Sequence, residues 1–201
     1  RSYLTLALDD KLFKIAKIND VPVPGQLDRR SRPVTLGYTK RVESDRAVWG
    51  YNAELALNLP GGSGNDLAAY RTEDTRVQRV DWRALRGAGN YSVLRPSGWL
   101  WSVRGQFQYS PDALISGEQF GLGGAASVRG TGERVLAGDK GLFASAELST
   151  PELRTGLRLF GFMDTGWLNN NGGGVVPTKP ESDQLISGGL GVRYGAGLYN
   201  F

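Results

Sequence analysis

Residues 99–109 read WLWSVRGQFQY, and this stretch decides the fold class. The odd-numbered residues are apolar, aromatic or glycine. The even-numbered residues are polar, with the exception of Leu100 at the start. A period of two predicts a β-strand with one apolar face. Strands of globular proteins usually have about 5–6 residues, whereas strands that cross a membrane need about 9–11. The length of this segment therefore favours a membrane-spanning strand.

The same alternation recurs along the chain. In residues 48–59, one face carries Trp49, Tyr51, Ala53, Leu55, Leu57 and Leu59. We expect this face to contact lipid, and we expect Asn52, Glu54 and Asn58 on the other face to contact water in a lumen. The periodic segments predict eight or nine strands, drawn from 2–9, 11–19, 33–43, 47–59, 75–87, 90–94, 98–109, 141–150, 156–168 and 185–198.

Alternation alone does not tell a membrane barrel from a soluble barrel, because a soluble barrel turns its apolar face inward. Tryptophan and tyrosine stand at the ends of several apolar faces, and these residues prefer the interface between membrane and water. Together with strand length, they favour an all-β fold, an antiparallel transmembrane β-barrel. A soluble ligand-binding β-barrel is the alternative.

The segments between the strands alternate between short turns and longer loops, which is the outer-membrane pattern. We expect a tight turn at 9–11 and a loop at 21–33 with three prolines and a basic patch of Arg29, Arg30 and Arg32. Residues 60–66 are glycine-rich, and 169–174 and 175–183 form a long polar loop. The arginine-rich span 71–95 contains interleaved acids, which predicts a solvated strand face.

Composition excludes several kinds of chemistry. The chain has no cysteine and no histidine, so it lacks disulfides, thiol nucleophiles, Ser-His-Asp triads and zinc sites of Cys or His. Residues 61–66 resemble one calcium-binding β-roll repeat, but that architecture needs tandem copies. Residues 121–124 are not followed by the Lys of a P-loop. We therefore expect no catalytic residue, metal or cofactor, and neither a nucleic-acid nor a small-molecule partner.

Residues 117–150 read GEQFGLGGAASVRGTGERVLAGDKGLFASAELST. They resemble the two-partner secretion transporters, outer-membrane pores that export large haemolysins and adhesins. The matching elements are Phe120, Leu122-Gly123-Gly124, Ser127-Val128-Arg129-Gly130, Glu133, Gly138-Asp139-Lys140-Gly141, Glu147-Leu148 and Pro151 to Leu153. Downstream, residues 162–166 (Phe-Met-Asp-Thr-Gly) fit the strand motif Phe-x-Asp-x-Gly of that family. The shared spacing covers roughly residues 117–198.

The resemblance implies a plug loop at about 110–140 whose tip, Val128-Arg129-Gly130, folds back into the barrel lumen. It also implies that Arg129 pairs with Asp164. The alternation supports the position of Asp164, because a carboxylate faces lipid only at high cost. The strand-motif residues are Phe162 and Gly166. Candidates for the same lumen network, on polar faces of their strands, are Glu147, Arg158 and Arg193.

The sequence departs from the family pattern in two ways. Thr131 stands where the family usually has an aromatic residue, so we expect a less rigid loop tip. Family members also carry periplasmic POTRA domains and about sixteen strands. We expect residues 1–201 to be a barrel region without a POTRA domain, the C-terminal piece of a larger barrel, and Phe201 to be a truncation point.

The resemblance implies a porin-like channel in a Gram-negative outer membrane that exports an unfolded protein of the haemolysin or adhesin type. Its partners are then the secreted protein and outer-membrane lipid. A barrel-assembly insertase of the same superfamily is an alternative, since it shares the Val-Arg-Gly loop. The spacing from Gly138-Asp139 to Glu147-Leu148 favours the secretion transporter.

Overall fold

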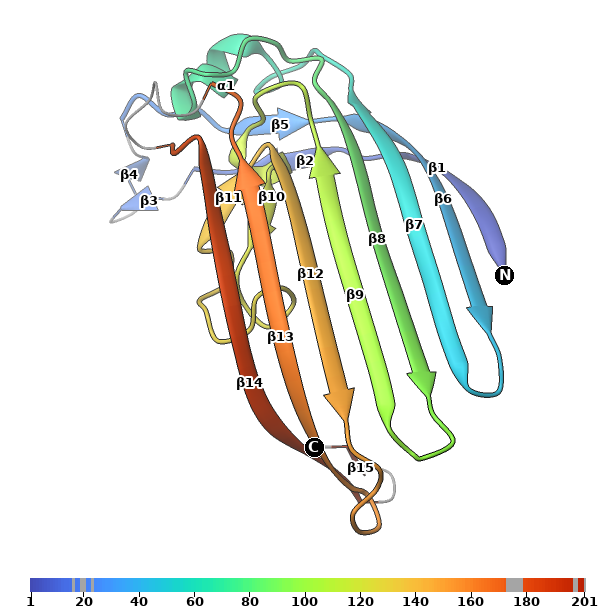
Figure 1. Cartoon of the computed structure of the whole chain (residues 1–201). Coiled ribbons are helices and arrows are strands. Elements are labelled where there is room, and N and C mark those ends of the chain that lie inside the picture. The colour runs from blue at the N-terminus through green and yellow to red at the C-terminus, as the bar shows by residue number, and fades with distance from the viewer. Residues whose placement is uncertain (16, 19–20, 23, 173–178, 197–198, 201) are drawn as a thin grey trace.

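The computed structural model describes residues 1–201 except 16, 19–20, 23, 173–178, 197–198 and 201 (Figure 1). Its main element is a curved nine-stranded antiparallel sheet in the order β1-β6-β7-β8-β9-β12-β13-β14-β15. The strands are β1 (Ser2–Leu8), β6 (Pro33–Glu43), β7 (Ala47–Asn58), β8 (Arg83–Leu94), β9 (Leu100–Tyr109), β12 (Lys140–Ser149), β13 (Leu157–Asn169), β14 (Ser182–Ala196) and β15 (Tyr199–Asn200). The sheet is open, with β1 at one edge.

The two ends of the sheet differ (Figure 1). Short hairpin connections at 44–46, 95–99 and 150–156 lie at one end, and the long connections lie at the other. The smaller elements of the long connections are β2 (Lys11–Phe13), β3 (Lys17–Ile18), β4 (Val21–Pro22), β5 (Arg29–Ser31), α1 (Leu67–Glu73), the 3-10 helix η1 (Ser116–Glu118), β10 (Phe120–Leu122) and β11 (Leu136–Gly138). Among the described residues, no helix has the length and apolarity needed to cross a membrane.

The outer face of the sheet is apolar and open to its surroundings. Leu190 keeps 90% of its surface exposed, and other outward side chains behave similarly. They include Leu4, Leu6, Leu36, Leu55, Leu57, Val103, Leu142, Met163, Ile186 and Val192. In water this surface would be a large exposed apolar patch, whereas in a bilayer it meets lipid. The alternative of a soluble ligand-binding barrel is therefore wrong, since such a barrel would turn these residues inward.

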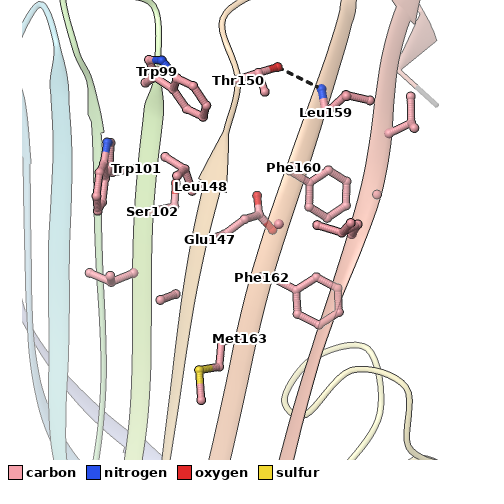
Figure 2. Close-up of a pocket in the computed structure, with 16 residues that line it drawn as sticks. Trp99, Trp101, Ser102, Glu147, Leu148, Thr150, Leu159, Phe160, Phe162 and Met163 are labelled. Carbon is pink, nitrogen blue, oxygen red and sulfur yellow. Dashed lines mark hydrogen bonds between the residues drawn. The ribbon is translucent and has the colours of Figure 1, made fainter.

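Aromatic side chains mark both ends of the apolar face. The exposed ones near the short hairpins are Tyr51, Tyr91, Trp99, Trp101 and Tyr194, and those near the long connections are Tyr109 and Trp167. Between β9 and β14 the outer face is also hollowed, and Trp101, Leu148 and Met163 are among the residues that line this hollow (Figure 2). The aromatic residues at the two ends of the apolar face match the two interfacial girdles that border the apolar band of a membrane barrel.

Two apolar clusters lie against the inner side of the sheet. The first joins the region of α1 to the start of the connection between β9 and β12, and it contains Ala56, Tyr70, Val77, Trp82, Ala84, Ala113, Leu114 and Ile115. The second contains Leu122, Val128, Phe143 and Leu168. Each cluster packs a long connection against strands of the sheet. The packed core therefore lies between the long connections and the inner wall.

The predicted strands 33–43, 47–59, 98–109, 141–150 and 156–168 agree with the structure to within two residues at each end. For the predicted strand 185–198, β14 begins three residues earlier, at Ser182, and residues 197–198 lie outside the described part. The prediction of separate strands at 75–87 and 90–94 is wrong, because a single strand, β8, covers Arg83–Leu94. The prediction of one strand at 11–19 is also wrong, because the described residues there form two separate short strands, Lys11–Phe13 and Lys17–Ile18, which pair with different partners.

The arginine-rich span was expected to be one solvated strand face, and that expectation is wrong. Residues 71–73 of the span belong to the end of α1, and they are followed by a loop in which Arg76 is buried between two carboxylates. The expected loop at 21–33 contains β4 and β5. Its three arginines do not form a free basic patch, because Arg29 pairs with Glu73 and both other arginines pair with Asp10.

The glycine-rich loop at 60–66 leads into α1. Asp66 caps the helix, and its carboxylate accepts a hydrogen bond from the backbone N–H of Ala69 at 2.9 Å. Asn65 is buried and bonds to Asn58 at 2.9 Å. Asn58 also donates to the Val80 carbonyl, so the expectation that Asn58 faces lumen water is wrong. Part of the expected polar loop at 175–183, together with Phe201, lies outside the described residues, and residues 182–183 belong to β14.

The assignment of the two faces predicts different costs for the same substitution. Val103→Arg places a charge on the outer face near the middle of β9, and it should destabilise the folded protein by about 2–4 kcal/mol. Gln106→Arg lies on the same strand but points inward, and it should cost much less. The measurement is the free energy of unfolding of the intact protein from lipid bilayers. Equal costs at the two positions would contradict the assignment.

Candidate functional site

The connection between β9 and β12, residues 110–139, folds back along the inner wall of the sheet (Figure 1). We call it the plug loop. Its strands β10 and β11 form a hairpin in which Leu122 pairs with Leu136. Leu122 and Val128 are completely buried in the cluster with Phe143 of β12. The loop is therefore packed against the wall through apolar contacts before any charged group is considered.

Three alternate residues of β13 form the seat of the plug loop. Phe162, Asp164 and Gly166 all face inward because side chains alternate along a strand. A Cβ at Gly166 would stand 2.6 Å from a methyl carbon of Leu122, so glycine is what lets the loop approach the wall. The strand motif thus supplies an aromatic ring at Phe162, a carboxylate at Asp164, and space for the Leu122 side chain at Gly166.

Arg129 at the loop tip docks on this seat. Its Nε and Nη2 donate to the two carboxylate oxygens of Asp164 at 2.7 and 2.8 Å, and its backbone N–H donates to the same carboxylate at 3.1 Å. The guanidinium lies 3.7 Å from the ring centroid of Phe162. Asp164 has a fully buried side chain, so a bidentate, charge-assisted contact compensates its loss of water.

Glu147 on the neighbouring strand β12 extends the cluster. It accepts from Arg129 Nη1 at 2.8 Å and from Arg193 Nη1 at 2.5 Å. Arg193 also lies over the ring of Phe160, 4.3 Å from its centroid. Ser145 accepts a further bond from Arg129 at 3.2 Å. Two arginines therefore share two carboxylates on the inner wall.

These contacts fix the charge of the tip. Hydrogen bonds from Arg129 to Asp164, and the nearby Glu147, raise the pKa of the Arg129 guanidinium above its ordinary value despite its partial burial. The group stays charged across the whole accessible pH range. Deprotonation of the arginine therefore does not weaken this contact.

The loop tip is braced by its own side chains. Gly130 has a φ of +83°, a left-handed conformation that glycine adopts without strain. The hydroxyl of Thr131 donates to the Val128 carbonyl at 2.8 Å and accepts from Gly124 N–H at 3.2 Å. The hydroxyl of Ser127 bridges the N–H and carbonyl of Gly123. Thr131 thus supplies polar bracing where an aromatic residue would pack.

A buried carboxylate in the plug loop, Glu118, holds the root of the loop. It accepts from Ser31 at 2.6 Å, from Arg86 of β8 at 2.9 Å and from Lys11 of β2 at 3.1 Å. Arg86 also donates to Gln108 of β9. Glu118 thereby joins the loop to the wall and to the connection between β1 and β6.

A second buried carboxylate, Asp139, stands where the plug loop enters β12. One of its oxygens accepts from the N–H of Leu114 and from Gln119 at 2.9 and 3.1 Å. The other accepts from Arg76 and from the N–H of Asn171 at 3.0 and 2.9 Å. Arg76 is in turn paired with Asp74 at 2.6 Å. The Asp139 carboxylate therefore joins three long connections, which lie between β7 and β8, between β9 and β12, and between β13 and β14.

The structure brings together most residues that the sequence singled out. Those at the seat are Val128, Arg129, Gly130, Glu147, Phe162, Asp164, Gly166 and Arg193. Arg158 is not among them, contrary to expectation, because its guanidinium donates to the carbonyls of Gly98 and Thr150 near a hairpin end.

Sequence reasoning missed the two carboxylates that hold the root. Asp139 lies in a motif that was recognised, but its partners come from connections far away in the sequence. Glu118 gave no signal, because an isolated acid beside a strand is most often a solvated one. Among the described residues, no cluster of three or more acids, histidines or cysteines offers a metal site.

Comparison with known proteins gives the site a context. Residues 14–194 match a family described as "Haemolysin secretion/activation protein ShlB/FhaC/HecB". Over 76 residues the chain is 37% identical to the outer membrane transporter CdiB of Escherichia coli O6:K15:H31 (strain 536 / UPEC). This alignment covers 35% of this chain and 13% of the relative.

Two solved structures share the fold. CdiB from Escherichia coli superposes with a TM-score of 0.73 at 22% identity, over 96% of this chain and 36% of that chain. CdiB from Acinetobacter baumannii superposes with a TM-score of 0.66 at 21% identity, over 89% of this chain and 30% of that chain. The open sheet is therefore part of a transmembrane β-barrel wall, and the chain spans about a third of those proteins.

The cluster at the seat predicts strong coupling between its two central residues. Arg129→Ala leaves Asp164 without its cation, and Asp164→Ala leaves Arg129 with Glu147 alone, so each change should expose the loop tip. The coupling free energy in a double-mutant cycle should be about 1–3 kcal/mol. The measurement is amide hydrogen exchange of residues 123–134 in the intact protein. Additive effects would show that the two residues act independently.

The bracing role of Thr131 gives a second prediction. Thr131→Val keeps the shape but removes both hydrogen bonds of the hydroxyl, and the free energy of local opening at the tip should fall by about 1–2 kcal/mol. Thr131→Ser keeps the hydroxyl and is the matched control. Hydrogen exchange at Gly124 reports the loss directly. Similar exchange in both variants would exclude the hydroxyl as the brace.

Proposed function

The chain belongs to the ShlB/FhaC/HecB family of haemolysin secretion/activation proteins, and on that premise we propose that it forms part of an outer-membrane pore that exports an unfolded partner protein. The partner is a secreted protein of the haemolysin or adhesin type. Residues 1–201 form a barrel region that contacts lipid of a Gram-negative outer membrane, and the connection at 110–139 is its plug.

The observation that supports this proposal best is the way the plug loop is held. A covalently fixed or fully packed loop would close a pore permanently. Here the tip rests on Asp164 through the single side chain and backbone N–H of Arg129, next to a small apolar cluster. A contact of this kind is strong enough to keep a pore closed and remains reversible.

The inner wall away from the seat suits the passage of a polypeptide. Inward-facing side chains of β6 to β9 are mainly small or polar, and they include Thr35, Thr39, Asn52, Asn90, Ser92, Ser102 and Gln106. Such groups exchange hydrogen bonds with water or with a passing chain at little net cost. The proposed transport step requires no catalytic residue, since folding of the partner outside the cell favours outward movement.

Export by the full-length transporter tests the proposal. Arg129→Ala and Asp164→Ala should each reduce export of the partner about tenfold, because the loosened tip no longer leaves and returns to one defined position on the wall, while insertion into the membrane is retained. Arg158→Gln is the control, because Arg158 lies outside the seat. The amount of partner in the medium, relative to transporter in the outer membrane, is the measurement.

Normal export by both alanine variants would contradict the role of the contact between Arg129 and Asp164 in export. Absence of export by the wild-type transporter with its own partner would contradict the proposed function itself.

A further inference from the structure

One arginine of the inner wall, Arg104 on β9, has no carboxylate partner within the described part of the chain. It is half-buried, and its guanidinium lies 5.3 Å from the ring centroid of Phe143. An arginine in a partly dry wall normally finds an acid, since the charge is costly without one. The position of Arg104 is therefore unexplained by the closed arrangement.

The strand register places Arg104 in line with the seat of the plug. Arg104 pairs with Ser145 of β12, and Ser145 pairs with Asp164 of β13. Asp164 pairs in turn with Ser187 of β14, whose buried hydroxyl has no hydrogen-bond partner in the described part of the chain. Two unused donors thus flank the carboxylate in one row across the inner wall.

Departure of the plug tip leaves Asp164 poorly compensated. Arg129 supplies three of its hydrogen bonds, and all three are lost together. Glu147 loses one arginine but keeps Arg193. The residue that needs a new cation on opening is therefore Asp164, and the cost of leaving it unpaired opposes opening.

We propose that Arg104 is the replacement counter-ion of Asp164 when the plug loop is released. The inference rests on the proposed function, and it makes Arg104 a positioning residue for the open state. In the closed state Arg129 occupies the carboxylate and Arg104 stays on Phe143. In the open state Arg104 moves across Ser145 to Asp164.

The wall allows this movement. Adjacent strands are about 4.8 Å apart, so the two inter-strand spacings from β9 across β12 to β13 separate Arg104 from Asp164 by roughly 10 Å, which an extended arginine and an aspartate span together. Ser145 lies between them with a short side chain that can donate to the same carboxylate. Phe143, which holds Arg104 now, belongs to the cluster beneath Leu122 and Val128, so release of the plug also removes part of the packing around that ring.

Single-channel recording of the full-length transporter in planar bilayers tests the proposal. Arg104→Gln and Arg104→Met remove the charge, and each should shorten the open dwell time about five- to tenfold. Arg104→Lys should recover most of it. Arg158→Gln removes the charge of another inward-facing arginine that lies outside the seat, so it is the control and should behave as wild type.

The decisive comparison is made in an Asp164→Asn background, where no carboxylate awaits a new cation. There Arg104→Gln should change the open dwell time by less than about twofold. Wild-type dwell times in both uncharged variants, or an equally large effect in the Asp164→Asn background, would overturn the role of Arg104. A wild-type transporter that opens but exports no partner would instead contradict the proposed function and leave the dwell-time comparison intact.

Discussion

A carboxylate on the inner wall of a membrane sheet needs a cation, and the loop supplies it. Asp164 is completely buried, and Arg129 reaches it from 35 residues earlier in the chain. The position of the loop tip depends on this contact, and the alternation that turns Asp164 away from lipid also turns Phe162 and Gly166 towards the loop. The aromatic ring supports the guanidinium, and the glycine admits Leu122. Three alternate, inward-facing residues of β13 therefore form the seat of the loop.

The plug loop is held in two different ways along its length. Its root is joined to neighbouring connections and to the wall by Glu118 and Asp139, each with several partners from distant segments. Its tip depends on Arg129 and on a small apolar cluster. In the proposed transporter, this difference allows the tip to leave the wall while the root keeps the loop within reach of its seat.

The sequence predicted the strands and the faces where a period of two was long and unbroken, as in residues 99–109 and 157–168. It failed where distant residues decide the structure. The helix α1 is short, and it is stabilised by Asp66 and by packing of Tyr70 into a cluster that β7, β8 and the plug loop build together. Likewise Arg76 resembled a solvated arginine, since its partner Asp139 lies 63 residues away. Such partners follow from the fold and not from local pattern.

If the plug tip is a releasable part of a pore, the distance between the tip and the inner wall changes when the pore opens. Residues 1–201 contain no cysteine, so spin labels can be attached at Ala126→Cys in the loop and Ala88→Cys on β8, in a full-length transporter whose remaining residues are free of cysteine or have been made so. Pulsed electron paramagnetic resonance should give one narrow distance distribution for the resting protein. With the secreted partner engaged, a second and clearly shifted population should appear, and Arg129→Ala should populate it without the partner. A single unchanged distance under all three conditions would contradict the account.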